Sequence, residues 1–63
     1  MHKVTENSRH LATCKTERSA MISVARQIAA DTSGRVLTIT APDGTATECR
    51  NDGCAIDYRE VTR

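Results

Sequence analysis

An amphipathic segment over residues 16–33 that runs directly into a tight turn is the feature that most restricts how this chain can fold. Apolar side chains recur there at offsets of 0, 3, 4, 7 and 8 from the first, a spacing that places them on one stripe of an α-helix. Thr16 is suited to cap the start of this helix and Gly34 to end it. The stripe, which should face a sheet, consists of Met21, Val24, Ala25, Ile28 and Ala29.

Two segments rich in Val, Ile and Thr flank residues 41–44, whose sequence is APDG. The proline sets the first dihedral angle of a β-turn, and the glycine supplies a positive φ. We therefore expect residues 35–41 and 45–50 to form an antiparallel hairpin. Because side chains alternate between the faces of a strand, Leu37 and Ile39 share the face that should meet the helix.

Both ends of the chain are expected to add strands. Residues 2–15 indicate an N-terminal strand or a loose hairpin, with its turn at Asn7-Ser8. A second tight turn at residues 51–53 should lead into a last strand over residues 54–61.

The predicted fold class is α+β, in one domain that spans residues 1–63. A single helix packs on a three- to four-stranded antiparallel sheet, in the order β-α-β-β-β. The face of the sheet away from the helix should be wet or bound to something, and it carries Thr38, Thr40, Glu48 and Arg50.

The composition indicates a thin core and marginal stability. Among 63 residues there are twelve Val, Ile, Leu and Met, one Tyr and no Phe or Trp. A dimer, a metal, a disulfide or a larger partner would add stability to so small a domain. It should also lack the volume for a substrate cavity of about 300 Å³ or more, which argues against an enzyme that acts alone.

The charge distribution is uneven and suits a protein partner at least as well as a nucleic acid. The net charge of +1 divides into +3 over residues 1–30 and −2 over residues 31–63. This is not the strong basic footprint of a nucleic-acid-binding domain. The sequence has no apolar run long enough for a signal peptide or a membrane span, and three cysteines is an odd number. We therefore expect a cytoplasmic protein in a reducing compartment.

Cys49 and Cys54 flank the second turn, so their relation depends on the length of the loop. If the loop is Asn51-Asp52, the two cysteines lie directly opposite each other and a strained disulfide is possible. If the turn is Asp52-Gly53, Cys49 pairs with Ile56 instead. The alternative is that both cysteines are small buried apolar residues.

The other potentially reactive side chains do not form a recognisable catalytic or metal-binding motif. No C-x-x-C or H-x₃-H spacing links the histidines and cysteines. His10 and Cys14 would point the same way on one strand, but no third orienting group or glycine-rich elbow accompanies them. We therefore expect no catalytic residue, no metal and no cofactor. The residues considered are His2, His10, Cys14, Cys49 and Cys54.

Residue type suggests where a partner would bind. Tyr and Arg are preferred anchors at protein interfaces. Direct binding of nucleic acid is possible but not favoured, because Tyr58 is the only aromatic residue and stacking platforms are absent. The predicted partner-binding residues are Arg26, Arg50, Tyr58 and Arg59.

Residues 17–60 resemble small phage-encoded anti-CRISPR proteins. The resemblance lies in the helical segment AMISVARQIA, the strand RVLTIT, the turn that ends in Gly44 and the two short strands that follow. It implies a non-enzymatic inhibitor that binds the type I CRISPR surveillance complex (Cascade) in the cytoplasm of a bacterial host and blocks its access to target DNA. The chain is also similar to a bacterial domain family with a β-α-β-β order and a DG hairpin turn. The alternative function is a small bacterial nucleic-acid-binding or regulatory domain that self-associates, and a homodimer is compatible with either.

Overall fold

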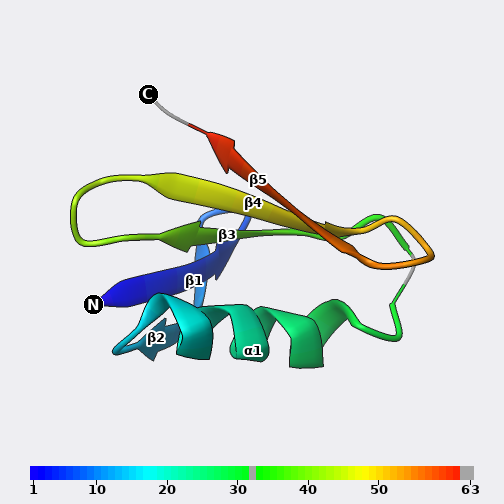
Figure 1. Ribbon diagram of the computed structural model, residues 1–63, viewed down its shortest axis with the longest axis horizontal. Coiled ribbons are helices and arrows are strands. Elements are labelled where there is room, and N and C mark those ends of the chain that lie inside the picture. The colour runs from blue at the N-terminus through cyan, green and yellow to red at the C-terminus, as the bar shows by residue number, and fades with distance from the viewer. Residues whose placement is uncertain (32, 62–63) are drawn as a thin grey trace.

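The computed structural model describes residues 1–31 and 33–61, which form a helix and a five-stranded antiparallel sheet (Figure 1). Along the chain the elements are β1 (His2–Glu6), β2 (Arg9–Cys14), α1 (Glu17–Ile28), β3 (Val36–Thr40), β4 (Ala46–Asn51) and β5 (Ile56–Val61). The strands lie in the order β2-β1-β3-β4-β5. The α+β class is confirmed, but the described residues contain five strands where three to four were predicted. The order β-α-β-β-β is corrected to β-β-α-β-β-β.

The N-terminal hairpin accounts for the additional strand. Asn7 and Ser8 both adopt positive φ (50° and 68°), the conformation that a two-residue hairpin turn needs. A bulge then interrupts the pairing of β1 with β2: Val4 lies opposite Ala12, whereas Thr5 lies opposite His10. Leu11 is the extra residue, and its side chain packs against the core. This bulge breaks the polar–apolar alternation, which explains why the sequence pattern is weak here.

The core lies between α1 and one face of the sheet. Val4, Leu37, Ile39 and Cys49 are buried on that face, and Ala20, Val24 and Ile28 are buried on the helix. The predicted contact of Leu37 and Ile39 with the helix is therefore confirmed. The helix is rotated from the predicted stripe, however, because Ala20 is fully buried while Ala29 is exposed. Ala20 is therefore part of the core that joins the helix to the sheet.

The helix begins where the sequence predicts but ends earlier. The Thr16 hydroxyl accepts a hydrogen bond from the Ser19 backbone N–H (3.1 Å), so the predicted cap is confirmed. The end at Ile28 replaces the predicted end near Ser33. Gly34 has φ +90° but lies well beyond the last turn, so it is not the residue that ends the helix.

A residue of β4 caps the helix instead. The Asn51 side-chain amide Nδ2 donates to the carbonyl oxygens of Ile28 (2.6 Å) and Ala29 (3.1 Å). The Ile28 carbonyl also accepts a hydrogen bond from the backbone N–H of Asp31 (3.1 Å), just after the helix. A helix leaves its last four C=O groups without partners inside the helix, and Asn51 adds donors to them that no local sequence pattern could reveal.

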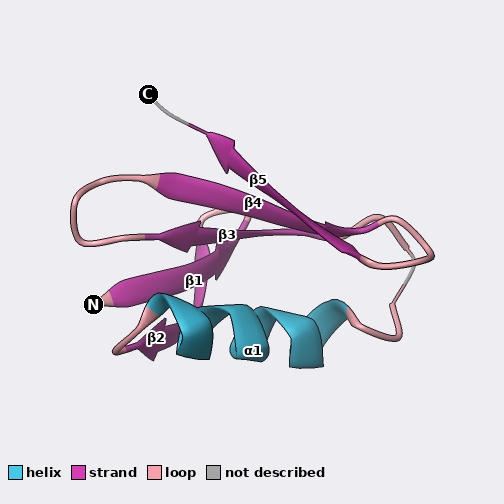
Figure 2. Cartoon of the chain, in the orientation of Figure 1, coloured by secondary structure: helices cyan, strands magenta, loops and turns pink. Residues whose placement is uncertain are grey.

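The two C-terminal hairpins differ in how well the sequence predicted them. In the first, Gly44 N–H donates to Ala41 O (3.0 Å) and Thr45 N–H to Asp43 Oδ1 (2.9 Å), so the predicted turn is confirmed. In the second, the loop is longer than the predicted turn: Asp52 N–H donates to Ala55 O (3.1 Å), and β5 begins at Ile56 instead of Cys54 (Figure 2).

The helix covers only part of the sheet. It contacts β1 and β2 most extensively and β3 and β4 less, and β5 forms the edge of the sheet that lies away from the helix (Figure 1). No helix or strand of the described residues covers the other face of the sheet (Figure 2). Over the described residues, the structure has no helix with the length and apolar character that crossing a membrane requires.

Candidate functional site

The uncovered face of the sheet is polar, and its composition follows from the strand register. Residues that lie opposite each other on neighbouring strands share a face, so the pairings define rows across the sheet. One row reads His10, Thr5, Thr38, Glu48 and Arg59, and a neighbouring row reads Val36, Arg50 and Asp57. The predicted exposure of Thr38, Thr40, Glu48 and Arg50 on this face agrees with these rows, and all four residues line one shallow hollow of about 480 Å³.

Four charges of alternating sign lie at the β4–β5 end of this face. Glu48 lies opposite Arg59 and Arg50 opposite Asp57, and together they line a small surface hollow. Cross-strand side chains of this kind have Cβ atoms about 4.5–5.5 Å apart. Yet in the described part of the chain, the ion pairs within 4.0 Å are those of Arg35. The four charges are therefore arranged to complement one another, and their polar atoms stay accessible to a partner. We call Glu48, Arg50, Asp57 and Arg59 the charged quartet.

The four predicted partner-binding residues do not share one surface. Arg50 and Arg59 belong to the quartet on the uncovered face. Tyr58 lies opposite the buried Cys49, so its side chain is on the helix side of the sheet, where it is 37% exposed. Arg26 is exposed on the helix. A single flat partner surface could contact the two sheet arginines together, but not all four residues.

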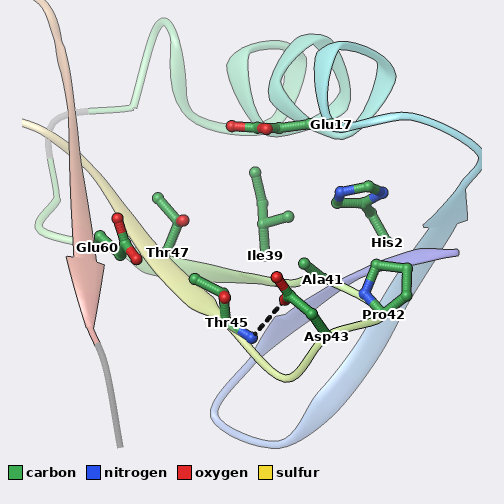
Figure 3. A pocket seen from close by; sticks show the side chains of 9 residues that line it. All are labelled: His2, Glu17, Ile39, Ala41, Pro42, Asp43, Thr45, Thr47 and Glu60. Atoms are coloured by element: carbon green, nitrogen blue, oxygen red, sulfur yellow. Dashed lines mark hydrogen bonds between the residues drawn. The ribbon is translucent and has the colours of Figure 1, made fainter.

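A second hollow, of about 570 Å³, opens on the helix side of the sheet. Figure 3 shows its wall: Glu17 projects from the start of the helix, Ile39 lies beneath, and His2 and Glu60 come from opposite sides. It exists because the helix does not extend over β5. The expectation that so small a domain lacks such a volume is therefore wrong, although this hollow lies at the rim and is open to solvent. Its other lining residues are Ala41, Pro42, Asp43, Thr45 and Thr47.

The three cysteines are free, so the possible Cys49–Cys54 disulfide does not form. The longer loop places Cys49 opposite Tyr58, and neither of the two registers considered from the sequence occurs. Cys49 is fully buried, and this burial raises the pKa of its thiol to about 11. Cys54 is exposed, so the description as a small buried residue fits Cys49 alone.

His10 and Cys14 are separated by the bulge in β2. Cys14 lies opposite His2, whereas His10 lies opposite Thr5 on the uncovered face, so the expectation that the two side chains point the same way is wrong. The His10 ring nitrogen Nε2 lies 2.8 Å from the Thr13 hydroxyl. Across residues 1–31 and 33–61, no group of three or more His, Cys, Asp or Glu side chains is placed to hold a metal ion.

Arg35, which sequence reasoning did not single out, connects three parts of the fold. Its Nε and Nη2 atoms donate to both carboxylate oxygens of Glu6 (2.9 and 2.8 Å), and Nη1 lies 3.5 Å from Asp31 Oδ2. The hydrogen bonds from Arg35 are the main reason why the pKa of the Glu6 carboxyl is lowered. The pKa of Asp31 is lowered as well, chiefly by hydrogen bonds from Ser33.

Only one signal in the sequence pointed toward this cluster, the i,i+4 spacing of Asp31 and Arg35. The longer-range partner, Glu6, could not be identified without the sheet order. Comparison of the chain with protein-family models, with curated protein sequences and with solved structures finds no match.

Proposed function

We propose that this chain is a non-enzymatic inhibitor that binds a protein partner through the uncovered face of its sheet. The partner that we propose is a type I CRISPR surveillance complex, whose access to target DNA the bound chain would block. The observation that carries this proposal is the charged quartet on a face that no other element covers. The choice of partner is supported by the resemblance of residues 17–60 to small anti-CRISPR proteins.

The character of this face favours a protein partner over a nucleic acid. Each arginine of the quartet lies opposite a carboxylate, so the patch has no net positive charge. A phosphate backbone is attracted by concentrated basic charge, and single strands are bound by stacking on aromatic rings. The only aromatic side chain, Tyr58, lies on the other side of the sheet. Alternating charges instead suit a protein surface with its own pattern of opposite charges.

The test is direct binding to a purified type I surveillance complex loaded with its guide RNA. We expect the chain to co-elute with the complex and to prevent its binding of fluorescent target DNA. Arg50→Glu reverses a charge at the centre of the face and should weaken binding roughly tenfold or more. Arg18→Glu makes the same charge change on an exposed helix position and should bind like the wild type.

Two outcomes would contradict the proposal. One is equal loss of binding in Arg18→Glu and Arg50→Glu, which would remove the sheet face from the interface. The other is direct binding of DNA without the complex, with affinity that falls steeply as salt rises. That result would favour the nucleic-acid-binding alternative.

A further inference from the structure

We propose that two copies of this chain pair antiparallel through the free edge of β5, which joins their sheets into one continuous sheet. This inference goes beyond the proposed function, because edge-to-edge pairing leaves the uncovered face open in both copies. It depends on the backbone groups of β5, on the exposure of that edge and on the order of its charges.

The hydrogen-bond pattern identifies which backbone groups of β5 point to the free edge. Ala41 N–H donates to Thr45 O (2.8 Å), so these two residues form a hydrogen-bonded pair. Along β3 and β4, hydrogen-bonded pairs then recur at every second residue. The remaining residues of β4 therefore direct their N–H and C=O groups toward β5. The hydrogen bond from Asp52 N–H to Ala55 O, in the hairpin of β4 and β5, leads to the same assignment of backbone directions. The residues of β5 left with outward N–H and C=O groups are Ile56, Tyr58 and Glu60.

The β5 edge is more open than the other edge of the sheet. It pairs with β4 without a bulge over all six residues and lies away from the helix (Figure 1). The opposite edge, β2, carries the bulge at Leu11 and packs under the helix. Bulges and covering elements are the usual protection against edge pairing. Within residues 1–31 and 33–61, the edge of β5 has neither, and its Tyr58 and Val61 are 37% and 38% exposed.

Among two-fold axes at residues 57–60 of β5, the charges favour the axis at Tyr58. In an antiparallel pair, the N–H and C=O groups of two opposed residues point either toward the other strand in both residues or away from it in both. A residue of one kind therefore cannot lie opposite a residue of the other kind. A two-fold axis meets this condition only where it passes between a residue and the same residue of the second copy. With the axis at Tyr58, Asp57 of each copy lies opposite Arg59 of the other. An axis at Asp57, Arg59 or Glu60 would place a charged side chain opposite its own copy, which is destabilising.

This register also extends the row of alternating charges on the uncovered face and covers exposed apolar surface on the helix side. On the uncovered face, the row Arg50–Asp57 would continue into Arg59 and Glu48 of the second copy, so charge signs alternate along the whole row. On the helix side, the two Tyr58 rings would lie beside each other at the axis. Their contact would cover apolar surface that the helix leaves exposed. For a domain with a thin core, such burial is a direct source of stability.

The test exchanges charges between copies. Asp57→Arg alone places Arg opposite Arg59, and Arg59→Asp alone places Asp opposite Asp57, so either variant should dimerise roughly tenfold more weakly or worse. An equal mixture of the two variants restores both opposite-charge pairs and should form a heterodimer. Sedimentation equilibrium measures each case against the 6.9 kDa single chain. Arg18→Asp, on the helix, is the control and should dimerise like the wild type.

Recovery in the mixture cannot be explained by misfolding of the single variants, so it is the decisive result. The proposal is overturned if the wild type stays at the mass of one chain at about 1 mM, a concentration at which even weak pairing is detected. It is also overturned if the single variants dimerise as well as the wild type, or if the mixture does not recover although circular dichroism shows that both variants are folded. A monomer that binds an added extended peptide along β5 would assign this edge to another partner.

Cross-linking tests the register independently. In a chain with Cys14→Ser, Cys49→Ala and Cys54→Ser, Tyr58→Cys places two thiols at the two-fold axis, and removing Cys49, which lies opposite position 58 in the same chain, prevents an intrachain disulfide. Opposed residues in a bonded pair have Cα atoms about 5.5 Å apart, which a disulfide can bridge. Mild oxidation should therefore link two copies. Glu60→Cys in the same background lies opposite Ile56 and should not link to itself. Equal linking at both positions, or linking at position 60 alone, would refute this register.

Discussion

Arg35 shows how one side chain can hold distant parts of a small fold together. It lies just before β3 and donates to Glu6 at the end of β1, while its third nitrogen approaches Asp31 beyond the helix. The paired hydrogen bonds from a guanidinium to a carboxylate fix direction as well as distance. In a fold whose core contains so few large side chains, this polar contact joins the end of β1 to the segment that leads into β3.

The contribution of this contact should depend on pH. Because the pKa of Glu6 is lowered in the folded state from its ordinary value of 4.5, the stabilisation is present above that value and is lost as pH falls through the lowered pKa. We expect Arg35→Gln to lower the urea midpoint at about pH 7 and to have a much smaller effect at about pH 3. Urea titrations followed by circular dichroism check this. An equal difference in urea midpoint between variant and wild type at both pH values would contradict this expectation.

The three thiols should differ widely in reactivity. At about pH 8, Cys54 should react quickly with iodoacetamide, because it is exposed. Cys49 is fully buried with a raised thiol pKa, so its alkylation should be slower by roughly a hundredfold or more. Mass spectrometry over a time course measures the rates. In denaturant all three should react alike, and equally fast reaction of Cys49 in native protein would show that it is not enclosed.

The helix shows what a sequence pattern determines about an element and what it does not. Its start and its amphipathic character follow from local signals, because Thr16 and the apolar spacing act within a few residues. Its rotation depends on the sheet beneath, against which Ala20 is buried while Ala29 stays exposed. Its end is capped by Asn51, which belongs to a strand formed much later in the chain. Local chemistry predicts elements, and contacts between elements set their limits.

The same division explains the outcome for the candidate site. Alternation along β3 and β4 correctly assigned Thr38, Glu48 and Arg50 to the uncovered face. The length of the loop before β5 could not be inferred from the sequence, so the residue opposite Cys49 was misassigned. The bulge at Leu11 likewise reversed the expected relation between two side chains, because one extra residue moves those that follow to the other face.

The rotation of the helix can be tested by adding volume on each side. Ala20→Leu should destabilise the fold by about 1–3 kcal/mol, because the side chain would be forced into a closely packed contact. Ala29→Leu adds the same atoms at an exposed position and should change the free energy of unfolding by less than about 0.5 kcal/mol. Urea unfolding of both variants measures the difference. A larger destabilisation by Ala29→Leu than by Ala20→Leu would support the helix face that the sequence predicted.

At the scale of the whole molecule, the distribution of covered and uncovered surface decides how the chain can act. Seven apolar residues form the buried core among the described part of the chain, and one side of the sheet has no covering layer. The binding proposal uses that side, and the pairing proposal uses the edge of β5. Because the two sheets would join at their edges, a pair of chains would present two uncovered faces side by side, and Asp57 and Arg59 would take part in both the pairing and the binding face.

Association of this kind should be visible in thermal unfolding. If folding and pairing are coupled, the melting temperature rises with protein concentration, because a species that binds only the folded state stabilises it. We expect a rise of several degrees between about 10 μM and 1 mM for the wild type and a smaller rise for Asp57→Arg. Differential scanning calorimetry at several concentrations measures this. A melting temperature that does not depend on concentration in the wild type would contradict it.

The capping of α1 by Asn51 has a consequence for the time at which the helix becomes complete. Ile28 leaves the ribosome well before Asn51, which follows 23 residues later. During synthesis, the Ile28 carbonyl can bond to the backbone N–H of Asp31, but neither it nor the Ala29 carbonyl has the Asn51 amide until β4 arrives. The last helical turn of a nascent chain should therefore fray, and it should become ordered only when the chain is nearly finished.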